Sequence, residues 1–318
     1  MNIFKSQDHP IPIICIGNLS VGGSGKTPHT NYIVKLLNND YKVAILSRGY
    51  GRITLGFHYV STSSSATNVG DEPLQLKINN PNCIVAVNNN RNKGVKQILK
   101  DYPNINVILL DDGHQHRWIK AGLNIIVSPF YKPYYKDKIL PLGTLREHKD
   151  GANRSDIIII SKTPQNTSPT EEKGMLENMH LKPHQKAYFS SIQYNNFKSM
   201  NTDEDFIPND NYSIILVSGI VNVNPLVKQL ERNGHHINQI KFTDHHKYTN
   251  SDVQKILEKY NADESLKKLI LTTEKDATKL RQFLTKFKDS NFYYSPIEIK
   301  FEKHEEFDRQ IINYVAEN

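Results

Sequence analysis

Short apolar runs rich in β-branched residues alternate with longer mixed stretches through the first half of the chain. Six of these runs are predicted to be buried strands, namely Ile11–Ile16, Tyr41–Leu46, Cys83–Val87, Val107–Leu110, Leu123–Val127 and Asp156–Ile160. Strands that are apolar along their whole length are buried on both faces, and helices between them provide that cover. The pattern predicts an α/β fold built on a parallel sheet.

A second, smaller α/β series follows the polar stretch from Asn195 to Asn211. Its predicted strands are Tyr212–Val217, Ile237–Phe242 and Lys268–Leu271, and its predicted helices are Pro225–Asn233, Ser251–Tyr260 and Lys275–Lys286. Extended segments flank this series on both sides, at Ala187–Ile192 and Phe292–Ile299. We expect these two segments to pair and to connect two domains.

The end of the chain returns to a helical pattern. Phe307, Ile311 and Val315 are spaced to share one helix face, and we expect this helix to pack on the first domain. The predicted division is a first domain over residues 1–185 and a second part over residues 186–318. The second part contains the linker strands, the smaller α/β domain and the C-terminal helix.

Composition narrows the class of protein. The 318 residues are 37% hydrophobic, which is enough to build a core, and no apolar run is long enough to span a bilayer. Residues Met1–Pro10 are polar and lack the apolar core of a signal peptide. Cys15 and Cys83 lie inside predicted strands, which is typical of buried thiols in a reducing compartment. We therefore expect a cytoplasmic protein.

The net charge of +7 is compatible with nucleic acid, an anionic membrane or an anionic substrate as partner. The chain has no dense Lys/Arg run and no nucleic-acid-binding motif, so we expect no nucleic-acid partner. The segment from Phe130 to Lys138 interleaves aromatic residues with lysines. This composition suits a lipid headgroup boundary, and it suits an ordinary basic loop equally well.

The strongest chemical signal is the sequence Ser-Val-Gly-Gly-Ser-Gly-Lys-Thr, directly after the first predicted strand. Glycines let backbone N–H groups approach phosphate oxygens, and a following helix directs its positive end at the same anion. Lys26 can reach the β- and γ-phosphates, and the Thr27 hydroxyl can hold Mg²⁺. The predicted phosphate-binding loop consists of Ser20, Val21, Gly22, Gly23, Ser24, Gly25, Lys26 and Thr27. The strict pattern has Gly where this chain has Ser20.

Two carboxylates end the predicted strand that begins at Val107. In phosphate-binding-loop proteins, an acid at the end of a neighbouring strand holds Mg²⁺ directly or through water. Asp111 and Asp112 are therefore candidate Mg²⁺ ligands together with Thr27. His114 and His116 follow at alternating positions, where they could bind a transition metal or orient carboxylates or substrate.

Two further segments place acids where a proton could be transferred. Asp71 or Glu72 could accept a proton from a substrate hydroxyl, or they could cap a helix. Asp244 and His245 follow a predicted strand, where they could relay a proton or belong to a capped loop. The residues alone leave both readings open.

In their order along the chain, these motifs closely resemble the tetraacyldisaccharide 4′-kinase family of lipid A biosynthesis in Gram-negative bacteria. The resemblance covers nearly the whole chain and rests on Gly17–Pro28, Ser47–Gly51, Val69–Pro73, Asp111–His116, Leu140–Glu147, Asp244–His245 and Thr272–Ala277. Ser20 at the first loop position is normal for this family. The resemblance implies ATP-dependent phosphorylation of the 4′-hydroxyl of tetraacyldisaccharide 1-phosphate to give lipid IV-A. It also implies two α/β/α domains joined by a two-stranded linker.

The resemblance also implies roles for particular residues. Lys26 and Thr27 would bind ATP and Mg²⁺, and Asp111 and Asp112 would form the Mg²⁺ shell. Asp71 would be the catalytic base.

Three more residues receive roles in the same way. His245 would be the partner of Asp71, in preference to its neighbour His246. Arg146 and Glu147 would line the nucleotide or substrate site.

One feature departs from this family, whose members normally begin with a hydrophobic or amphipathic helix that helps them to sit on the inner membrane. Here the first predicted strand begins at Ile11, so we expect that helix to be absent and membrane docking to be weakened. We otherwise expect a monomer on the cytoplasmic face of the inner membrane, with an acylated glucosamine disaccharide 1-phosphate as substrate. The alternative is a kinase or ligase with the same loop that acts on a soluble small molecule.

Overall fold

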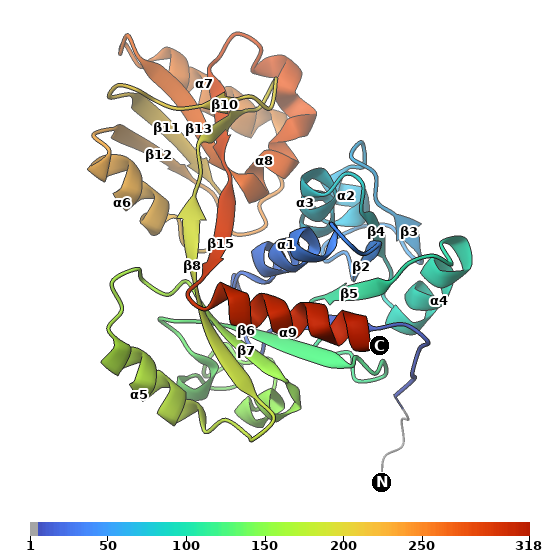
Figure 1. The fold of residues 1–318 in the computed structure, drawn as a ribbon. Coiled ribbons are helices and arrows are strands. Elements are labelled where there is room, and N and C mark those ends of the chain that lie inside the picture. Colours follow the sequence, from blue (N-terminus) through green and yellow to red (C-terminus); the bar gives the residue numbers. More distant parts are fainter. Residues whose placement is uncertain (1–5) are drawn as a thin grey trace. The chain divides into compact units, whose positions relative to one another are not determined.

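The computed structural model describes residues 6–318, and residues 1–5 lie outside it. The expectations about the segment before the first strand therefore fall partly outside the described residues. The chain divides into two compact units, which Figure 1 shows in sequence colours. The first unit comprises the residues up to Ser64, Asn68–Gln193 and Ile299–Asn318, and the second comprises Ser65–Thr67 and Tyr194–Glu298.

A nine-stranded sheet forms the centre of the first unit, counted over residues 6–318. Its spatial order is β15-β8-β7-β6-β1-β5-β2-β4-β3, with the bounds β1 (Ile13–Gly17), β2 (Val43–Ser47), β3 (His58–Tyr59), β4 (Ile84–Val87), β5 (Val107–Asp111), β6 (Leu123–Pro129), β7 (Ile157–Ser161), β8 (Lys186–Tyr194) and β15 (Ile297–Phe301). Neighbours from β4 to β8 pair in parallel, and β3 pairs antiparallel with β4. The predicted parallel sheet is confirmed.

Helices cover this sheet, as the apolar strands require. They are α1 (Lys26–Leu37), α2 (Ala66–Val69), α3 (Asp71–Asn79), α4 (Arg91–Asp101), α5 (Pro169–Met179) and α9 (His304–Glu317), with the 3₁₀ turns η1 (Tyr134–Lys136) and η2 (Lys149–Arg154). Ile13 and Cys15 of β1 pack in one core cluster with Val95 and Ile98 of α4. Because successive strand residues point to opposite faces, Ile14 of β1 faces the other way.

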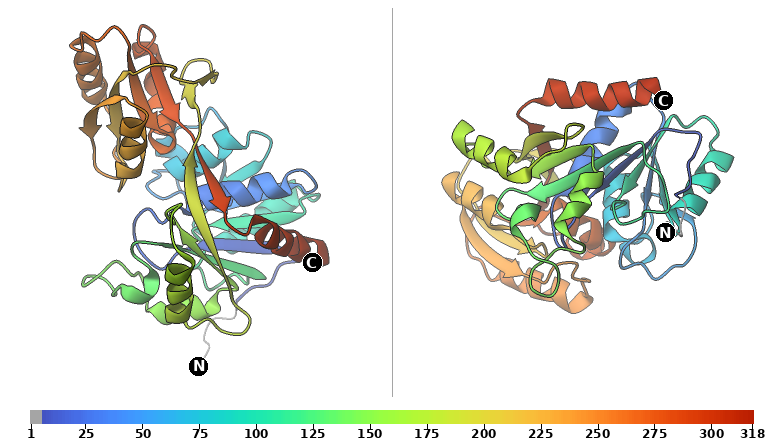
Figure 2. Two further views of the ribbon diagram at one scale, coloured as in Figure 1. Left: turned by 60° about the vertical axis from the view of Figure 1, so that its left-hand side comes forward. Right: turned by 90° about the horizontal axis from the view of Figure 1, so that it is seen from below.

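The C-terminal helix α9 is fixed to the first unit by aromatic packing and by one tyrosine. Phe307 is fully buried, and its ring stacks on Phe301 with the ring centroids 4.1 Å apart. The Tyr314 hydroxyl donates to the Ile13 carbonyl at 3.1 Å and accepts from the Ile13 amide at 3.2 Å. Figure 2 shows α9 lying along one side of the sheet. These contacts join the last helix to the strand that precedes the glycine-rich loop.

The second unit is a smaller α/β body around a six-stranded sheet of order β10-β9-β14-β13-β11-β12. Its elements are β9 (Phe197–Ser199), β10 (Asp205–Phe206), β11 (Ser213–Ser218), α6 (Asn224–Arg232), β12 (His236–Lys241), α7 (Asn250–Asn261), β13 (Lys268–Thr273), α8 (Glu274–Leu280), η3 (Arg281–Lys286) and β14 (Phe292–Ser295). β11, β12, β13 and β14 pair in parallel, and β9 is antiparallel to β14. The neighbouring strands β8 and β15 connect the two units.

Two details of the second unit differ from the sequence prediction. The single helix expected over Lys275–Lys286 is wrong, because α8 ends at Leu280 and a 3₁₀ turn continues the chain. This tighter turn leads to the fully buried Phe287, whose ring centroid lies 4.4 Å from that of Phe292. The short strands β9 and β10 lie in the polar stretch from Asn195 to Asn211, for which the sequence predicts no strand. Among the described helices, none combines the length and the apolar character needed to cross a membrane.

Removal of the Phe307 ring should show how much of the stability depends on α9. We expect Phe307→Ala to lower the free energy of unfolding by about 3–5 kcal/mol, because a fully buried aromatic ring leaves a cavity. Arg309→Ala, at an exposed position of the same helix, is the matched control and should change it by less than about 0.5 kcal/mol. Denaturant titration of the three proteins measures both values. Equal stability of both variants would contradict the anchoring role of α9.

Candidate active site

The glycine-rich segment forms the connection between β1 and α1. Gly22 and Gly25 have φ angles of 97° and 93°, a region that glycine enters without strain. Lys26 is the first residue of α1 and is buried, and Thr27 follows it. The N-terminal amides of α1 therefore lie at the end of the loop, where a helix attracts anions. The predicted strand–loop–helix arrangement is present.

One side of this loop is held by a neighbouring backbone segment. The Val21 amide donates to the Thr144 carbonyl at 2.8 Å, and the Arg146 amide donates to the Leu19 carbonyl at 2.7 Å. Ser20 forms an antiparallel bridge with Leu145 between these two bonds. The start of the phosphate-binding loop is thus a short piece of sheet, which fixes its direction.

Side chains hold the carbonyl groups on the other side of the loop. The Ser161 hydroxyl donates to the Ser24 carbonyl at 2.7 Å, and the Lys162 ammonium donates to the Gly23 carbonyl at 2.5 Å. The His29 ring lies between the Gly25 carbonyl, 2.7 Å from Nδ1, and the Ser190 hydroxyl, 2.8 Å from Nε2. Burial lowers the pKa of His29 to about 4, so the ring is neutral at pH 7 and Nδ1–H donates to Gly25.

The two acids after β5 lie beside the loop lysine. β5 pairs in parallel with β1, and Asp111 stands opposite Ile16 in that register. Asp112 Oδ1 is 3.5 Å from Lys26 Nζ, and both Asp112 oxygens are 3.1 Å from the Arg146 guanidinium. Asp111 is fully buried and accepts a 3.0 Å hydrogen bond from the Thr30 hydroxyl. The structure therefore brings Lys26, Arg146 and both acids together.

The two carboxyl groups have opposite electrostatic environments. Burial raises the pKa of Asp111 well above its usual value, and the nearby charges of Glu72 and Asp112 add to this. Burial opposes ionisation of Asp112 too, but Lys26 and Arg146 outweigh it and hold the pKa of Asp112 below its usual value. At Asp111, burial and the charges of two other acids outweigh the opposing charge of Lys26, so positive charge is in deficit there. This deficit fits a small hard cation with oxygen ligands at Asp111, Asp112 and Thr27.

Asp71 begins α3 in the same unit. The preceding Gly70 has a φ of 95°, and a Cβ there would lie 3.1 Å from the Cα of Gly49. This close approach brings the segment around Asp71 against the loop that follows β2. Asp71 is buried, and its carboxylate accepts a 3.0 Å hydrogen bond from the Glu72 amide. Asp71 is the first residue inside α3, whose N-cap is Gly70, so the helix-capping role that the sequence left open is not the one it has.

Arg91 is a residue of this region that sequence reasoning missed. It is buried, Nη1 donates to the Asn88 carbonyl at 2.5 Å, and no partner is found among the described residues for Nε and Nη2. Burial lowers the pKa of Arg91 to about 10, so it remains charged at pH 7. Burial together with the charges of Arg91 and Arg48 lowers the pKa of His116 to about 4. The sequence feature that could have indicated this residue is its position shortly after the predicted strand Cys83–Val87.

Glu147 and His114 link neighbouring segments of the first unit. Glu147 forms an ion pair with Arg154 at 2.8 Å and accepts from the Gln115 side chain at 3.2 Å. His114 lies 3.0 Å from the Gly151 carbonyl through Nε2. No group of three or more metal-ligating side chains occurs within the described part of the chain. The histidine pair is thus not accompanied by the further ligands that a transition-metal site needs.

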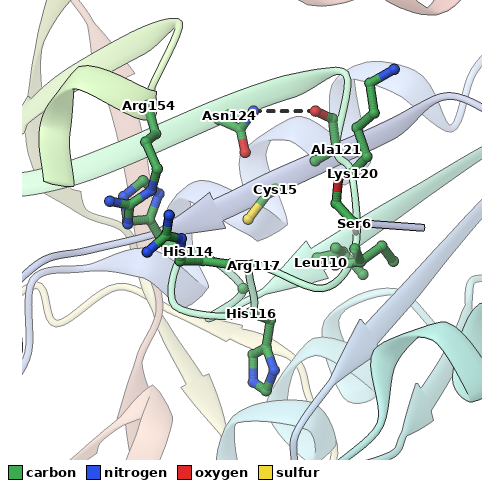
Figure 3. A pocket seen from close by; sticks show the side chains of 12 residues that line it. Ser6, Cys15, Leu110, His114, His116, Arg117, Lys120, Ala121, Asn124 and Arg154 are labelled. Carbon is green, nitrogen blue, oxygen red and sulfur yellow. Dashed lines mark hydrogen bonds between the residues drawn. The ribbon is translucent and has the colours of Figure 1, made fainter. Parts of the chain in front are cut away.

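A polar cavity of about 220 Å³ lies beside His114 and Arg154 (Figure 3). Its lining includes His114, His116, Arg117 and Arg154, which project from the connection between β5 and β6 and from η2. Cys15 of β1 forms part of its apolar wall, and burial raises the pKa of this thiol to about 12. The cavity is therefore basic and contains no reactive thiolate.

His245 belongs to the second unit, in the loop after β12. Its Nε2 is 3.3 Å from Lys275 Nζ and 3.7 Å from Asp244 Oδ2, and Lys275 is 3.5 Å from Asp244 Oδ1. Its φ of 56° is unusual for a residue other than glycine. Strained backbone of this kind is often found at functional positions. His245 is therefore held within a small charged cluster of its own unit.

The neighbouring His246 has a different environment. Its ring stacks on Phe242 with the centroids 4.5 Å apart, and Nε2 lies 3.0 Å from Asp252 Oδ2. Asp252 completes a capping box with Thr249 at the start of α7. His246 is thus tied into the packing of the second unit.

Comparisons with known proteins agree with this geometry. A family model described as tetraacyldisaccharide-1-P 4′-kinase matches residues 1–316. A tetraacyldisaccharide 4′-kinase from Bacteroides thetaiotaomicron is 40% identical, over 99% of this chain and 87% of that protein. One from Flavobacterium johnsoniae is 37% identical, over 99% of this chain and 91% of that protein. The crystal structure of LpxK from Aquifex aeolicus in complex with ATP matches with a TM-score of 0.75 and 27% identity, covering 99% of this chain and 91% of that one.

The neutral state of His29 should make the stability depend on pH. Its pKa is about 4 in the folded chain and near 6.5 when unfolded, so the unfolded state binds more protons between these values and stability falls as the pH falls. Between pH 6.5 and pH 5 this contribution is about 2 kcal/mol. We expect His29→Asn to remove that part of the pH dependence, measured by denaturant titration at several pH values. His58→Asn, at an exposed histidine, should leave the dependence unchanged, and an unchanged slope in His29→Asn would contradict the assignment.

Proposed function

The chain belongs to the tetraacyldisaccharide-1-P 4′-kinase family, and from this we propose that it phosphorylates the 4′-hydroxyl of a tetraacylated glucosamine disaccharide 1-phosphate with ATP. The observation that carries the proposal is the group formed by Lys26, Asp111 and Asp112 at the end of a glycine-rich loop. This group has the parts that phosphoryl transfer needs, namely donors for phosphate and acids for a metal.

We place the ATP phosphates on the loop from Ser20 to Thr27. The loop amides and the first turn of α1 would surround the β-phosphate, and Lys26 would neutralise charge on the γ-phosphate. The ATP-bound relative from Aquifex aeolicus supports the nucleotide. Arg146, held by Asp112, is positioned to contact the same phosphates once the carboxylate turns to a metal.

Mg²⁺ would be held by the Thr27 hydroxyl and by Asp112, with Asp111 behind them as a second carboxylate. The raised pKa of the buried Asp111 supports this, because a bound cation would supply the missing positive charge. When bound, Mg²⁺ would supply positive charge that stabilises the negative charge of the transferring phosphoryl group. Glu147 is engaged by Arg154 and Gln115, so its proposed place at the nucleotide or substrate site is to hold the segment that carries Arg146.

Asp71 is our candidate for the base that accepts the proton of the sugar hydroxyl. As that oxygen forms its bond to the γ-phosphorus, the bond from this phosphorus to the β–γ bridging oxygen breaks and ADP leaves. His245 is proposed as the partner of Asp71, as the family resemblance implies. Arg48 and Arg91 provide positive charge in the same unit as Asp71, which suits an acceptor that carries a 1-phosphate.

The acylated substrate suggests where the protein acts. We propose a peripheral protein on the cytoplasmic face of the inner membrane, functioning as a monomer. The family and its relatives do not favour the alternative of a soluble acceptor, and the experiment below tests it directly.

The first experiment is a mass-spectrometric kinase assay. Purified protein, Mg²⁺-ATP and tetraacyldisaccharide 1-phosphate in detergent micelles should give a lipid with one added phosphate, and chelation of Mg²⁺ should stop the reaction. Lys26→Ala should lower turnover by about 10²–10³-fold, since it removes a charge that stabilises the transition state. Absence of product from a protein that still binds ATP would contradict the proposed acceptor and favour a soluble one.

Substitution of Asp71 tests the base. We expect Asp71→Asn to lower turnover by about 10²–10⁴-fold, because the amide keeps the shape but accepts no proton. Affinity for ATP, measured by calorimetry, should change little. Asp40→Asn, at an exposed position after α1, is the control and should keep full turnover. Full turnover in Asp71→Asn would rule out this base.

The adjacent histidines of the second unit form a matched pair. We expect His245→Gln to lower turnover about 10–100-fold at unchanged stability, as for a residue that positions a reacting group. His246→Gln should lower the free energy of unfolding by about 1 kcal/mol, because it loses the Asp252 hydrogen bond, and should retain turnover. Kinetics and denaturant titration measure both, and the reverse pattern would assign the role to His246.

A further inference from the structure

Large apolar side chains are exposed in one loop of the first unit, between β6 and β7. In residues 131–149, called here the surface loop, Tyr131 is 78% exposed and Leu142 is 83% exposed. Ile139, Leu140 and Leu142 line a single cavity of about 400 Å³ on this loop, so these apolar groups are neighbours. Contiguous exposed apolar groups commonly mark an interaction surface.

The charge on the surface loop is mainly positive. Its exposed lysines are Lys132, Lys136, Lys138 and Lys149, and of these Lys132 lies 3.6 Å from Asp137 Oδ2. Its two acids are both engaged, since Glu147 pairs with Arg154, and Asp137 is almost buried and accepts hydrogen bonds from Thr144. The loop therefore presents leucines and lysines together, with its negative charge turned inward.

Hydrogen bonds fix the shape of this loop. The Leu140 amide donates to the Leu145 carbonyl at 3.0 Å, and the Gly143 amide donates to the Ile139 carbonyl at 3.2 Å. A Cβ on Gly143 would lie only 2.2 Å from the Lys138 carbonyl oxygen, so the turn requires glycine. The exposed leucines are thus presented by an ordered turn, and little conformational entropy is lost when they are covered.

The last residues of the surface loop, which do not include Lys138 or Leu142, contact the phosphate-binding loop through their backbone. Among them, Thr144 and Arg146 form the backbone bonds to Val21 and Leu19 described above. A partner bound at Leu142 would therefore lie a few residues from the phosphate-binding loop.

We propose that the surface loop docks the first unit on an anionic lipid bilayer, with Leu140 and Leu142 among the headgroups and the lysines over lipid phosphates. Apolar groups that enter the interface and lysines that attract anionic lipid act together in such binding. A symmetric contact with a second copy would instead place like charges opposite each other. The proposal rests on the proposed function only in that the docked membrane would supply the acylated substrate.

The test is co-sedimentation with vesicles of phosphatidylethanolamine and phosphatidylglycerol, compared with vesicles of phosphatidylcholine alone. The variant Leu142→Ser with Lys138→Glu removes one leucine and reverses one charge on the surface loop. The control, Leu266→Ser with Lys255→Glu, makes the same exchange at exposed positions of the second unit. We expect wild type and control to bind the anionic vesicles at least tenfold more strongly than the neutral ones. The loop variant should lose about tenfold or more in partitioning to anionic vesicles.

Three results would overturn the proposal. These are equal partitioning of the loop variant and wild type, equal binding to both kinds of vesicle, and a concentration-dependent mass without vesicles that the loop variant abolishes. The last result would assign the loop to self-association. A circular dichroism spectrum and an ATP affinity equal to wild type verify that the loop variant is folded.

Activity separates this inference from the proposed kinase reaction. If both are correct, the loop variant phosphorylates the lipid at the wild-type rate in detergent micelles and at least tenfold more slowly on anionic vesicles. Vesicle binding by a wild-type protein without lipid kinase activity would sustain the docking surface while the proposed function fails. Lipid kinase activity of the wild type, together with unchanged vesicle binding of the loop variant, would support the proposed function and contradict the docking surface.

Discussion

A loop that binds phosphate must turn its amide groups inward and its carbonyl groups outward before any phosphate arrives, and the rest of this site depends on that constraint. Three successive carbonyls, those of Gly23, Ser24 and Gly25, are satisfied from outside by Lys162, Ser161 and His29. With these oxygens engaged, the peptide planes cannot rotate freely. The conformational entropy of the loop is therefore lost during folding, and nucleotide binding does not have to order it. The donors come from β7, from the residue after β7 and from α1, so the sheet and the first helix together fix the loop.

The two acids beside the loop, Asp111 and Asp112, are also arranged before any ligand binds. Asp112 is already neutralised by Lys26 and Arg146, whereas the buried Asp111 faces further negative charge from Glu72. The site is thus balanced at one carboxylate and deficient in positive charge at the other. A bound cation would relieve the deficit, and it would release Lys26 and Arg146 toward phosphate oxygens. The ion pairs seen here are consistent with a site prepared for that exchange.

Much of the fold could be predicted from the chain alone, because the strands are long apolar runs and the phosphate-binding motif has a fixed local context. The sequence also indicated Lys26, Asp111 and Asp112, since motif and strand end coincide there, whereas Asp71 was indicated only by the family resemblance. Arg91 could not be predicted in this way. Its importance comes from burial and from its nearness to Arg48, which are set by the packing of β2 beside β4.

Other details depended on contacts between distant segments. The division of labour between Arg146 and Glu147 is invisible in sequence, because their partners Asp112 and Arg154 lie elsewhere in the chain. The end of α8 at Leu280 was missed because the helical pattern continues, while the buried Phe287 requires a tighter turn. The roles of the site residues, including His245, remain predictions.

The second unit enters and leaves the chain through neighbouring strands, β8 and β15. Beside the crossing point, the Asn195 amide donates to the Pro296 carbonyl at 3.1 Å, so the two connecting strands are adjacent there. The second unit is therefore an insertion into the first, comparable to a large hairpin loop. In protein-engineering terms, the two ends left by its excision would be close enough for a short turn to rejoin them. Apart from the short segment Ser65–Thr67, the first unit is in this sense a continuous domain interrupted once, and it could be grafted as a single body.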